Sequence, residues 1–208
     1  MDTLAPQLLT DPSRLPEIYA LRVTAWEQSP GSQHVNSLLF PNGWMDKLDT
    51  HPKAYHWILE DKNCILAAAH VKILEILEEC GQDFTGISLP SSRLYEYISQ
   101  LVIAPLYRKQ QIVSSLDKVR LEFLKKAEVA FALASPIPKR VDQLLGLGWH
   151  YLGNFSYQWR ADAPKQHPGP WCIWLPQNAL LWFYFRHTKP ISWPTSISSF
   201  SVIMLGLS

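Results

Sequence analysis

The stretch 101–116 reads LVIAPLYRKQQIVSSL, and its residue types indicate a strand, a tight loop and the start of a helix. The apolar run stops at Pro105, the cations Arg108 and Lys109 follow, and a helical pattern begins at about Gln111. The first turn of a helix exposes unpaired backbone N–H groups at the positive end of the helix dipole. We therefore expect a phosphate site here. The alternative is an ordinary strand-to-helix turn whose cations are solvated.

This strand–loop–helix resembles the segment of the GNAT-family N-acetyltransferases that holds the pyrophosphate of acetyl-CoA. The family pattern V-x-P-x-x-R-x-x-G-x-G/A falls here on Ile103, Pro105, Arg108, Gln111 and Val113. Both glycine positions are therefore substituted. Gln and Val fit a helical backbone, because its φ is negative. The loss of the two glycines affects how closely the backbone approaches a phosphate, or how the helix packs on the sheet.

The resemblance implies that acetyl-CoA, or another acyl-CoA, is the co-substrate and that no metal is needed. Backbone groups of Leu101, Val102 and Ile103 would pair with the pantetheine arm. The pyrophosphate would be held by Arg108, Lys109, Gln110, Gln111, Ile112, Val113 and Ser114.

Acyl transfer to an amine needs a base for the amine and a donor for the tetrahedral oxyanion. In the family a carboxylate on the strand before the loop is the base, and the matching residue is Glu96. A backbone N–H of the same strand would polarise the thioester carbonyl. Strand alternation places Glu96 on one side of the strand with Gln100 and Val102. The competing interpretation of Glu96 is a carboxylate that merely faces solvent.

The acid that reprotonates the leaving thiolate is the least defined role. Many relatives have a tyrosine in the helix before a Gly-aromatic pair, and this chain has Leu144 there. The role would fall to Tyr151, to Tyr97 or to water. For Tyr151 the alternative is a purely structural residue.

The rest of the chain follows the same fold in order over about residues 11–160. Helices are expected at about 12–26, 44–48, 111–126 and 136–145, and strands at 55–59, 64–74, 94–103, 129–134 and from 149. The helix 111–126 should bury Ile112, Leu116, Val119 and Phe123 and turn Asp117 to water. These patterns predict an α/β (α+β) protein with a GNAT-like acyl-CoA N-acyltransferase fold, in which helices flank a mixed central sheet.

Residues 161–208 differ in character, because prolines separate a dense set of aromatic residues. We expect a domain over 1–160 and a C-terminal extension over 161–208 that packs its aromatics on the domain. The alternative is an exposed aromatic surface for a partner, a second copy of the chain or a membrane interface. The apolar run 179–185 is too short to cross a bilayer.

Composition excludes several classes of function. The 208 residues carry a net charge of +1 and no basic block, which gives no reason to expect nucleic-acid binding. Three cysteines without paired spacing suggest neither a disulfide framework nor a zinc site. His56 and His70 lie in apolar strands and are expected to be core histidines, not ligands. No secretory signal is evident, so a cytoplasmic location is expected.

The sequence therefore predicts an N-acetyltransferase that acts on an amine of a small molecule or a protein. Two alternatives remain open. One is a GNAT fold that binds a ligand or partner without catalysis, because both loop glycines and the helical tyrosine are missing. The other is an acyltransferase for longer acyl chains.

Overall fold

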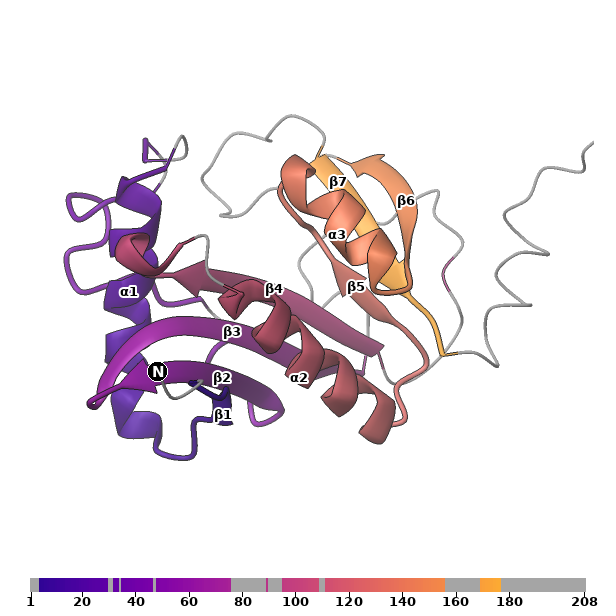
Figure 1. Ribbon diagram of the computed structural model, residues 1–208, viewed down its shortest axis with the longest axis horizontal. Coiled ribbons are helices and arrows are strands. Elements are labelled where there is room, and N and C mark those ends of the chain that lie inside the picture. Colours follow the sequence, from indigo (N-terminus) through magenta and orange to yellow (C-terminus); the bar gives the residue numbers. More distant parts are fainter. Residues whose placement is uncertain are drawn as a thin grey trace, which may run out of the picture.

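The computed structural model describes residues 4–29, 32–33, 35–46, 48–75, 89, 95–108, 111–155 and 169–176, with the backbone alone at 95–99 and 155. Within these residues seven strands form one mixed sheet in the order β1-β2-β3-β4-β5-β7-β6 (Figure 1). The strands are β1 (Gln7–Leu8), β2 (Ala54–Asp61), β3 (Cys64–Leu74), β4 (Tyr95–Ile103), β5 (Ala132–Ala134), β6 (Trp149–Phe155) and β7 (Gly169–Trp174).

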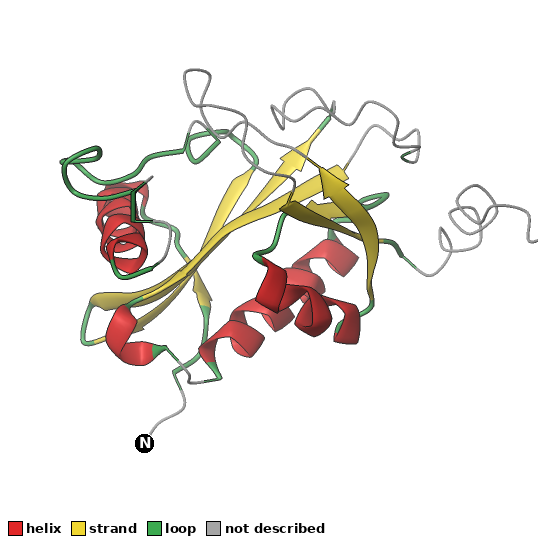
Figure 2. Cartoon of the chain, turned by 90° about the horizontal axis from the view of Figure 1, so that it is seen from above, coloured by secondary structure: helices red, strands yellow, loops and turns green. Residues whose placement is uncertain are grey.

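Helices cover both faces of the sheet (Figure 2). On one face α1 (Leu15–Glu27), which follows a 3-10 turn at Pro12–Arg14, packs on a cluster that includes Ile58, Ala68 and Val102. On the other face α2 (Ile112–Lys126) and α3 (Val141–Gly146) pack on a larger cluster. The expected flanking of a mixed sheet by helices is confirmed.

The hairpin of β2 and β3 forms as the sequence predicts. Its two turn residues, Lys62 and Asn63, have φ values of 47° and 65°. Two successive positive φ values define the type I′ turn, whose twist matches that of paired strands. This turn leads directly into β3, which lies between β2 and the central strand β4.

Strand alternation through β4 is interrupted by a bulge, contrary to expectation. Ala68 of β3 pairs with Val102 and His70 pairs with Ser99, so β4 has one residue more than β3 in this interval. Gln100 lies within it and has a φ of 52°. A bulge shifts the alternation by one position. Simple alternation therefore does not hold across the bulge. The expectation that Gln100 and Val102 lie on the same side of the strand as Glu96 is wrong.

One further expectation for local structure is wrong, and another holds only in part. No helix forms at 44–48, among residues 44–46 and 48 that the structure describes. Instead, Asp46 Oδ1 accepts from Leu48 N at 2.8 Å and Asp49 Oδ2 accepts from Asp46 N at 2.7 Å. Such side-chain bonds to the backbone compete with helical ones. The strand expected at 129–134 forms as β5, but it begins only at Ala132.

Asp117 is buried and does not face water. Its two carboxylate oxygens form ion pairs with Arg120, one turn later on α2, and with Arg140, just before α3. The expected helix face is otherwise correct: Ile112 and Leu116 are buried, and Val119 and Phe123 are partly buried against the core. A carboxylate can be buried when cations accompany it.

Part of the expected C-terminal extension belongs to the sheet. β7 lies between β5 and β6 and pairs antiparallel with both. Cys172 and Ile173 are fully buried there. A continuous apolar run is typical of a strand covered on both faces. The boundary expected at residue 160 therefore does not coincide with the edge of the sheet, and 177–208 lie outside the described residues.

Candidate functional site

The candidate site begins where β4 runs past β5. The parallel pairing of the two strands joins Glu96, Tyr97 and Ile98 of β4 to residues 132–134 of β5, and β4 continues for five more residues (Figure 1). The opposite edge of this continuation pairs with β3, where Ala68 faces Val102 and Ala67 faces Ile103. A strand edge beyond the end of its pairing offers backbone groups to an extended ligand.

The N-terminus of α2 lies directly after this strand and its 3-10 turn at Pro105–Tyr107. Gln111 is the N-cap residue and makes no side-chain capping bond. The first helical bond donates from Ser115 N to Gln111 O at 3.2 Å. The preceding N–H groups, those of residues 112–114, therefore lack helical acceptors and can face an anion.

The side chains of the first turn leave that approach open. Ile112 is buried in the core, and Val113 packs against the same cluster. The bulk of Val113 therefore lies at the helix–sheet contact, one of the two positions that its substitution for glycine suggested. Ser114 is exposed.

Arg108 has a structural contact that the sequence did not indicate. Its guanidinium donates to the carbonyl of Gln28 at 3.1 Å and to that of Ala25. These carbonyls belong to the C-terminal end of α1, where a cation is favourable. The contact joins the loop after β4 to α1 across about eighty residues of sequence. Lys109 and Gln110 lie outside the described residues.

The two predicted catalytic residues are not brought together. Glu96 pairs with Ile73 of β3 and Ala132 of β5, and its side chain lies outside the described atoms. Tyr151 lies on β6, with β5 and β7 between it and β4. Three strand spacings amount to about 14 Å. The Tyr151 side chain is exposed, and its hydroxyl donates to Asn154 Oδ1 at 2.8 Å.

Leu144, at the position where relatives have the acid, is buried in α3 against the core. Tyr97 lies in β4, and its side chain is outside the described atoms.

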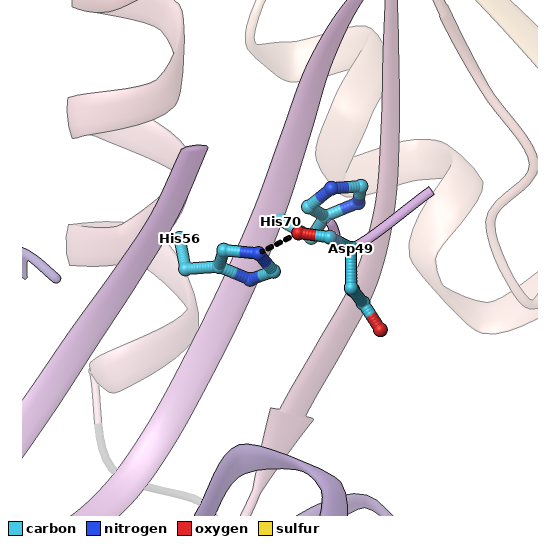
Figure 3. A group of neighbouring side chains, drawn as sticks. All are labelled: Asp49, His56 and His70. Atoms are coloured by element: carbon cyan, nitrogen blue, oxygen red, sulfur yellow. Dashed lines mark hydrogen bonds between the residues drawn. The ribbon is translucent and has the colours of Figure 1, made fainter. Parts of the chain in front are cut away.

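A buried polar cluster lies between α1 and the sheet, and no local sequence pattern indicated it as a unit. Arg22 pairs with both carboxylate oxygens of Asp49, at 2.6 and 2.8 Å. His56 Nε2 lies 3.1 Å from the backbone carbonyl of Asp49 (Figure 3). The rings of His56 and His70 stack, with centroids 4.8 Å apart. Both histidines are buried, which confirms the expectation of core histidines.

Asp49, His56 and His70 each offer a donor atom within 4.8 Å of the others, which raises the question of a metal. Both carboxylate oxygens of Asp49 are already bonded to Arg22, and one also accepts from Asp46 N. A guanidinium on the carboxylate opposes a second cation there. The group therefore fits a buried polar network better than a metal centre.

The two histidines predict how stability depends on pH. Burial lowers the pKa of His56, and it lowers the pKa of His70 further, with the neighbouring His56 adding to the effect. The unfolded chain therefore binds more protons below the ordinary pKa of about 6.5. We expect the free energy of unfolding to be level above that pH and to fall below it, by at most about 1.4 kcal/mol per pH unit per histidine.

Urea denaturation at pH 7.5, 6.5 and 5.5 measures this dependence. His70→Leu removes one of the two titrating groups, so its stability should fall less steeply with pH than that of the wild type. Equal stability of the wild type at all three values would contradict the prediction.

The sequence matches no protein-family model. It also matches no curated protein. Solved structures do resemble it. The acyl-homoserine lactone synthase BjaI, solved with SAM and isopentyl-CoA, has a TM-score of 0.62 at 11% identity, over 88% of this chain and 89% of its own. A GCN5-related N-acetyltransferase from Rhodopseudomonas palustris has a TM-score of 0.58 at 11% identity, over 85% and 98%. FeeM, an N-acyl amino acid synthase from uncultured soil microbes, has 0.57 at 11%, over 83% and 90%.

The chain therefore has the fold of the GNAT acyl-CoA N-acyltransferases, as the stretch 101–116 and the order of elements over residues 11–160 predicted. The similarity covers more than four fifths of the chain, although few residues are identical. Among the described residues, no helix combines the length and the apolar character needed to cross a membrane.

Proposed function

We propose that this protein is an acyl-CoA-dependent N-acyltransferase that transfers an acetyl or longer acyl group to an amine of a small molecule or a protein. The observation that carries the proposal is one juxtaposition: the backbone of β4 continues past β5 and leads directly to the uncapped N-terminus of α2. An extended pantetheine arm suits the first feature, and a pyrophosphate suits the second. BjaI, which has a similar fold, was solved with an acyl-CoA, isopentyl-CoA.

The proposed reaction gives a role to Glu96, to the backbone of β4 and to water. The acceptor amine loses a proton to Glu96, directly or through a water, and attacks the thioester carbonyl carbon. The C–N bond forms, and the C–S bond breaks as the tetrahedral intermediate collapses. A backbone N–H of β4 stabilises the oxyanion. Water protonates the thiolate in this proposal, because Tyr151 lies on β6, at one end of the sheet order, with β5 and β7 between it and β4.

The alternative, a binding module without turnover, rests on the two glycine substitutions and on Arg108. Because the Arg108 guanidinium already binds carbonyls of α1, it is less available to a phosphate. We therefore assign the phosphate contacts chiefly to the backbone of residues 112–114, and we do not expect Arg108 to dominate the affinity.

CoA binding tests the proposal. Acetyl-CoA and free CoA should both raise the melting temperature, with a gain of about 2.7 kcal/mol in stability at a concentration of 100 times the dissociation constant. Ser114→Glu places a carboxylate on the exposed first turn of α2, where it should stabilise the helix dipole and repel the pyrophosphate. Ser114→Gln is the uncharged control of similar size.

Isothermal titration should therefore show weaker CoA binding by Ser114→Glu than by Ser114→Gln, although the former is at least as stable. No binding of CoA at millimolar concentration by the wild type would overturn the enzyme proposal. Octanoyl-CoA, compared with acetyl-CoA in the same titration, tells whether the site prefers a longer acyl chain.

Replacing Glu96 tests catalysis apart from binding. Glu96→Gln keeps the shape of the side chain and removes the base, so turnover should fall about a hundredfold or more. Release of free CoA thiol in the presence of a panel of primary amines measures turnover, and titration should show unchanged CoA affinity. Glu122→Gln, on the exposed face of α2, is the matched control. Equal turnover of all three proteins would show that Glu96 is not the base.

A further inference from the structure

The loop between α1 and β2 is held firmly on α1. Gly43, with a φ of 88°, lies so close to α1 that an added Cβ would be 2.7 Å from the Cβ of Tyr19. Trp44 N donates to Tyr19 O at 3.0 Å, and Arg22 Nη1 donates to Trp44 O at 3.2 Å. The backbone of this loop therefore has several independent contacts with one helix.

The same loop is tied to the buried ion pair. Asp49 accepts two bonds from Arg22 and a third from the backbone N–H of Asp46, at 2.7 Å. The Arg22 and Asp49 side chains are 1% and 0% exposed. A buried charged pair of this kind is rigid, because separating it leaves a charge without solvent. The hydrogen bond to Asp49 therefore holds the backbone of Asp46 in place.

The side chain of Asp46 reaches the bulge of β4. Gln100 Nε2 donates to Asp46 Oδ2 at 3.2 Å, in a partly buried contact. Gln100 has a φ of 52°, which is unfavourable for most residues other than glycine. It lies just beyond Ile98, the last residue of β4 that pairs with β5. The Asp46 contact thus holds a strained residue at the place where the two strands separate.

We infer that Asp46 and Gln100 are positioning residues, which hold the β4 bulge so that its backbone donor faces the thioester carbonyl of the acyl-CoA. The inference rests on the proposed function and adds the group that orients the donor. Oxyanion stabilisation depends on donors that are fixed before the reaction. Pairing to β3 restrains only one edge of the bulge. The tether to α1 through Asp46, Asp49 and Arg22 supplies a second restraint.

The test reads the thioester carbonyl directly and needs no knowledge of the acceptor. The infrared C=O stretch of [1-¹³C]acetyl-CoA should move to lower frequency on binding to the wild type, because a hydrogen-bond donor polarises the carbonyl. Gln100→Gly removes the tether and tolerates the positive φ, so it avoids backbone strain. Its bound carbonyl should lose about half of the shift or more, while its affinity for free CoA changes less than about threefold.

Glu128→Gly is the matched control, since Glu128 also has a φ of 52° and is exposed after α2. It makes the same backbone change and should keep the full carbonyl shift. Asp46→Ala should behave like Gln100→Gly. Asp46→Asn should restore most of the shift, because its amide oxygen accepts from Leu48 N while its NH₂ donates to the side-chain oxygen of Gln100 once that amide has turned over.

The possible outcomes distinguish the positioning role of Asp46 and Gln100 from the proposed function. If the wild type binds acetyl-CoA with a shifted carbonyl and Gln100→Gly shows the same shift, the positioning role is overturned and the proposed function stands. If the wild type binds with no shift at all, the positioning role is likewise overturned. If acetyl-CoA does not bind to the wild type, the proposed function fails first and the positioning role fails with it.

Discussion

Arg22→Met is expected to lower the free energy of unfolding by about 3–5 kcal/mol, the range for breaking a buried ion pair from one side. Arg22 is fully buried and binds both carboxylate oxygens of Asp49. Removing the guanidinium leaves the Asp49 carboxylate buried without its cation, and methionine fills only the volume. Equilibrium urea denaturation at pH 7.5 measures the change.

Two further variants show whether the loss comes from the unpaired charge. Lys53→Met breaks the exposed pair with Glu75, whose side chains are 41% and 65% exposed, and should change stability by less than about 1 kcal/mol. The double variant Arg22→Met, Asp49→Leu should recover much of the loss, since no charge is left buried. A double variant less stable than Arg22→Met alone would contradict this account, as would a loss for Arg22→Met no larger than for Lys53→Met.

Gly43→Ala is expected to destabilise the protein by about 2–6 kcal/mol, the sum of backbone strain and overpacking. The φ of 88° is unfavourable for alanine, and the new methyl carbon would lie 2.7–2.9 Å from atoms of Tyr19 and Ala20, two of them in the backbone of α1. Neither helix nor loop can yield easily, because both are joined through Trp44 and Arg22. Thermal and urea unfolding measure the loss.

Gly148→Ala is its matched control. Gly148 has the same φ of 88°, but an added Cβ would meet nothing within 4 Å. This variant should show the strain alone, about 1–3 kcal/mol, and the difference between the two variants measures the close approach of loop and helix. Equal losses in the two variants would show that the loop is not packed tightly on α1.

Local patterns predicted the elements whose signal lies within a single segment. The turn at Lys62 and Asn63 is flanked by apolar runs, and the β2–β3 hairpin follows from that alone. The apolar stripe of α2, from Ile112 through Leu116, identified its buried face. Pro105 and the cations after it placed the boundary between β4 and α2, which is the centre of the candidate site.

Local sequence patterns gave wrong predictions where a residue distant in the sequence determined the environment of a side chain or strand. Asp117 looks like a solvent-facing residue until Arg140, 23 positions later, joins it. The WCIWL run at 171–175 lies among prolines, and its sequence predicts an arm outside the sheet. Most of the run instead forms a strand inside the sheet, because β7 pairs with both β5 and β6. Arg108 likewise finds its acceptors at the C-terminal end of α1, about 80 residues earlier in the chain.

The sequence by itself determined the GNAT-like fold and the strand–loop–helix that carries the candidate CoA site, because hydrophobic period, turn residues and helix starts are written over a few neighbouring positions. Only the tertiary structure decided the bulge at Gln100, its tether to Asp46 and the buried pair of Arg22 with Asp49. These features join residues from α1, a loop and β4. Their free energy depends on burial and on the closing of long loops, and neither quantity can be read from local spacing.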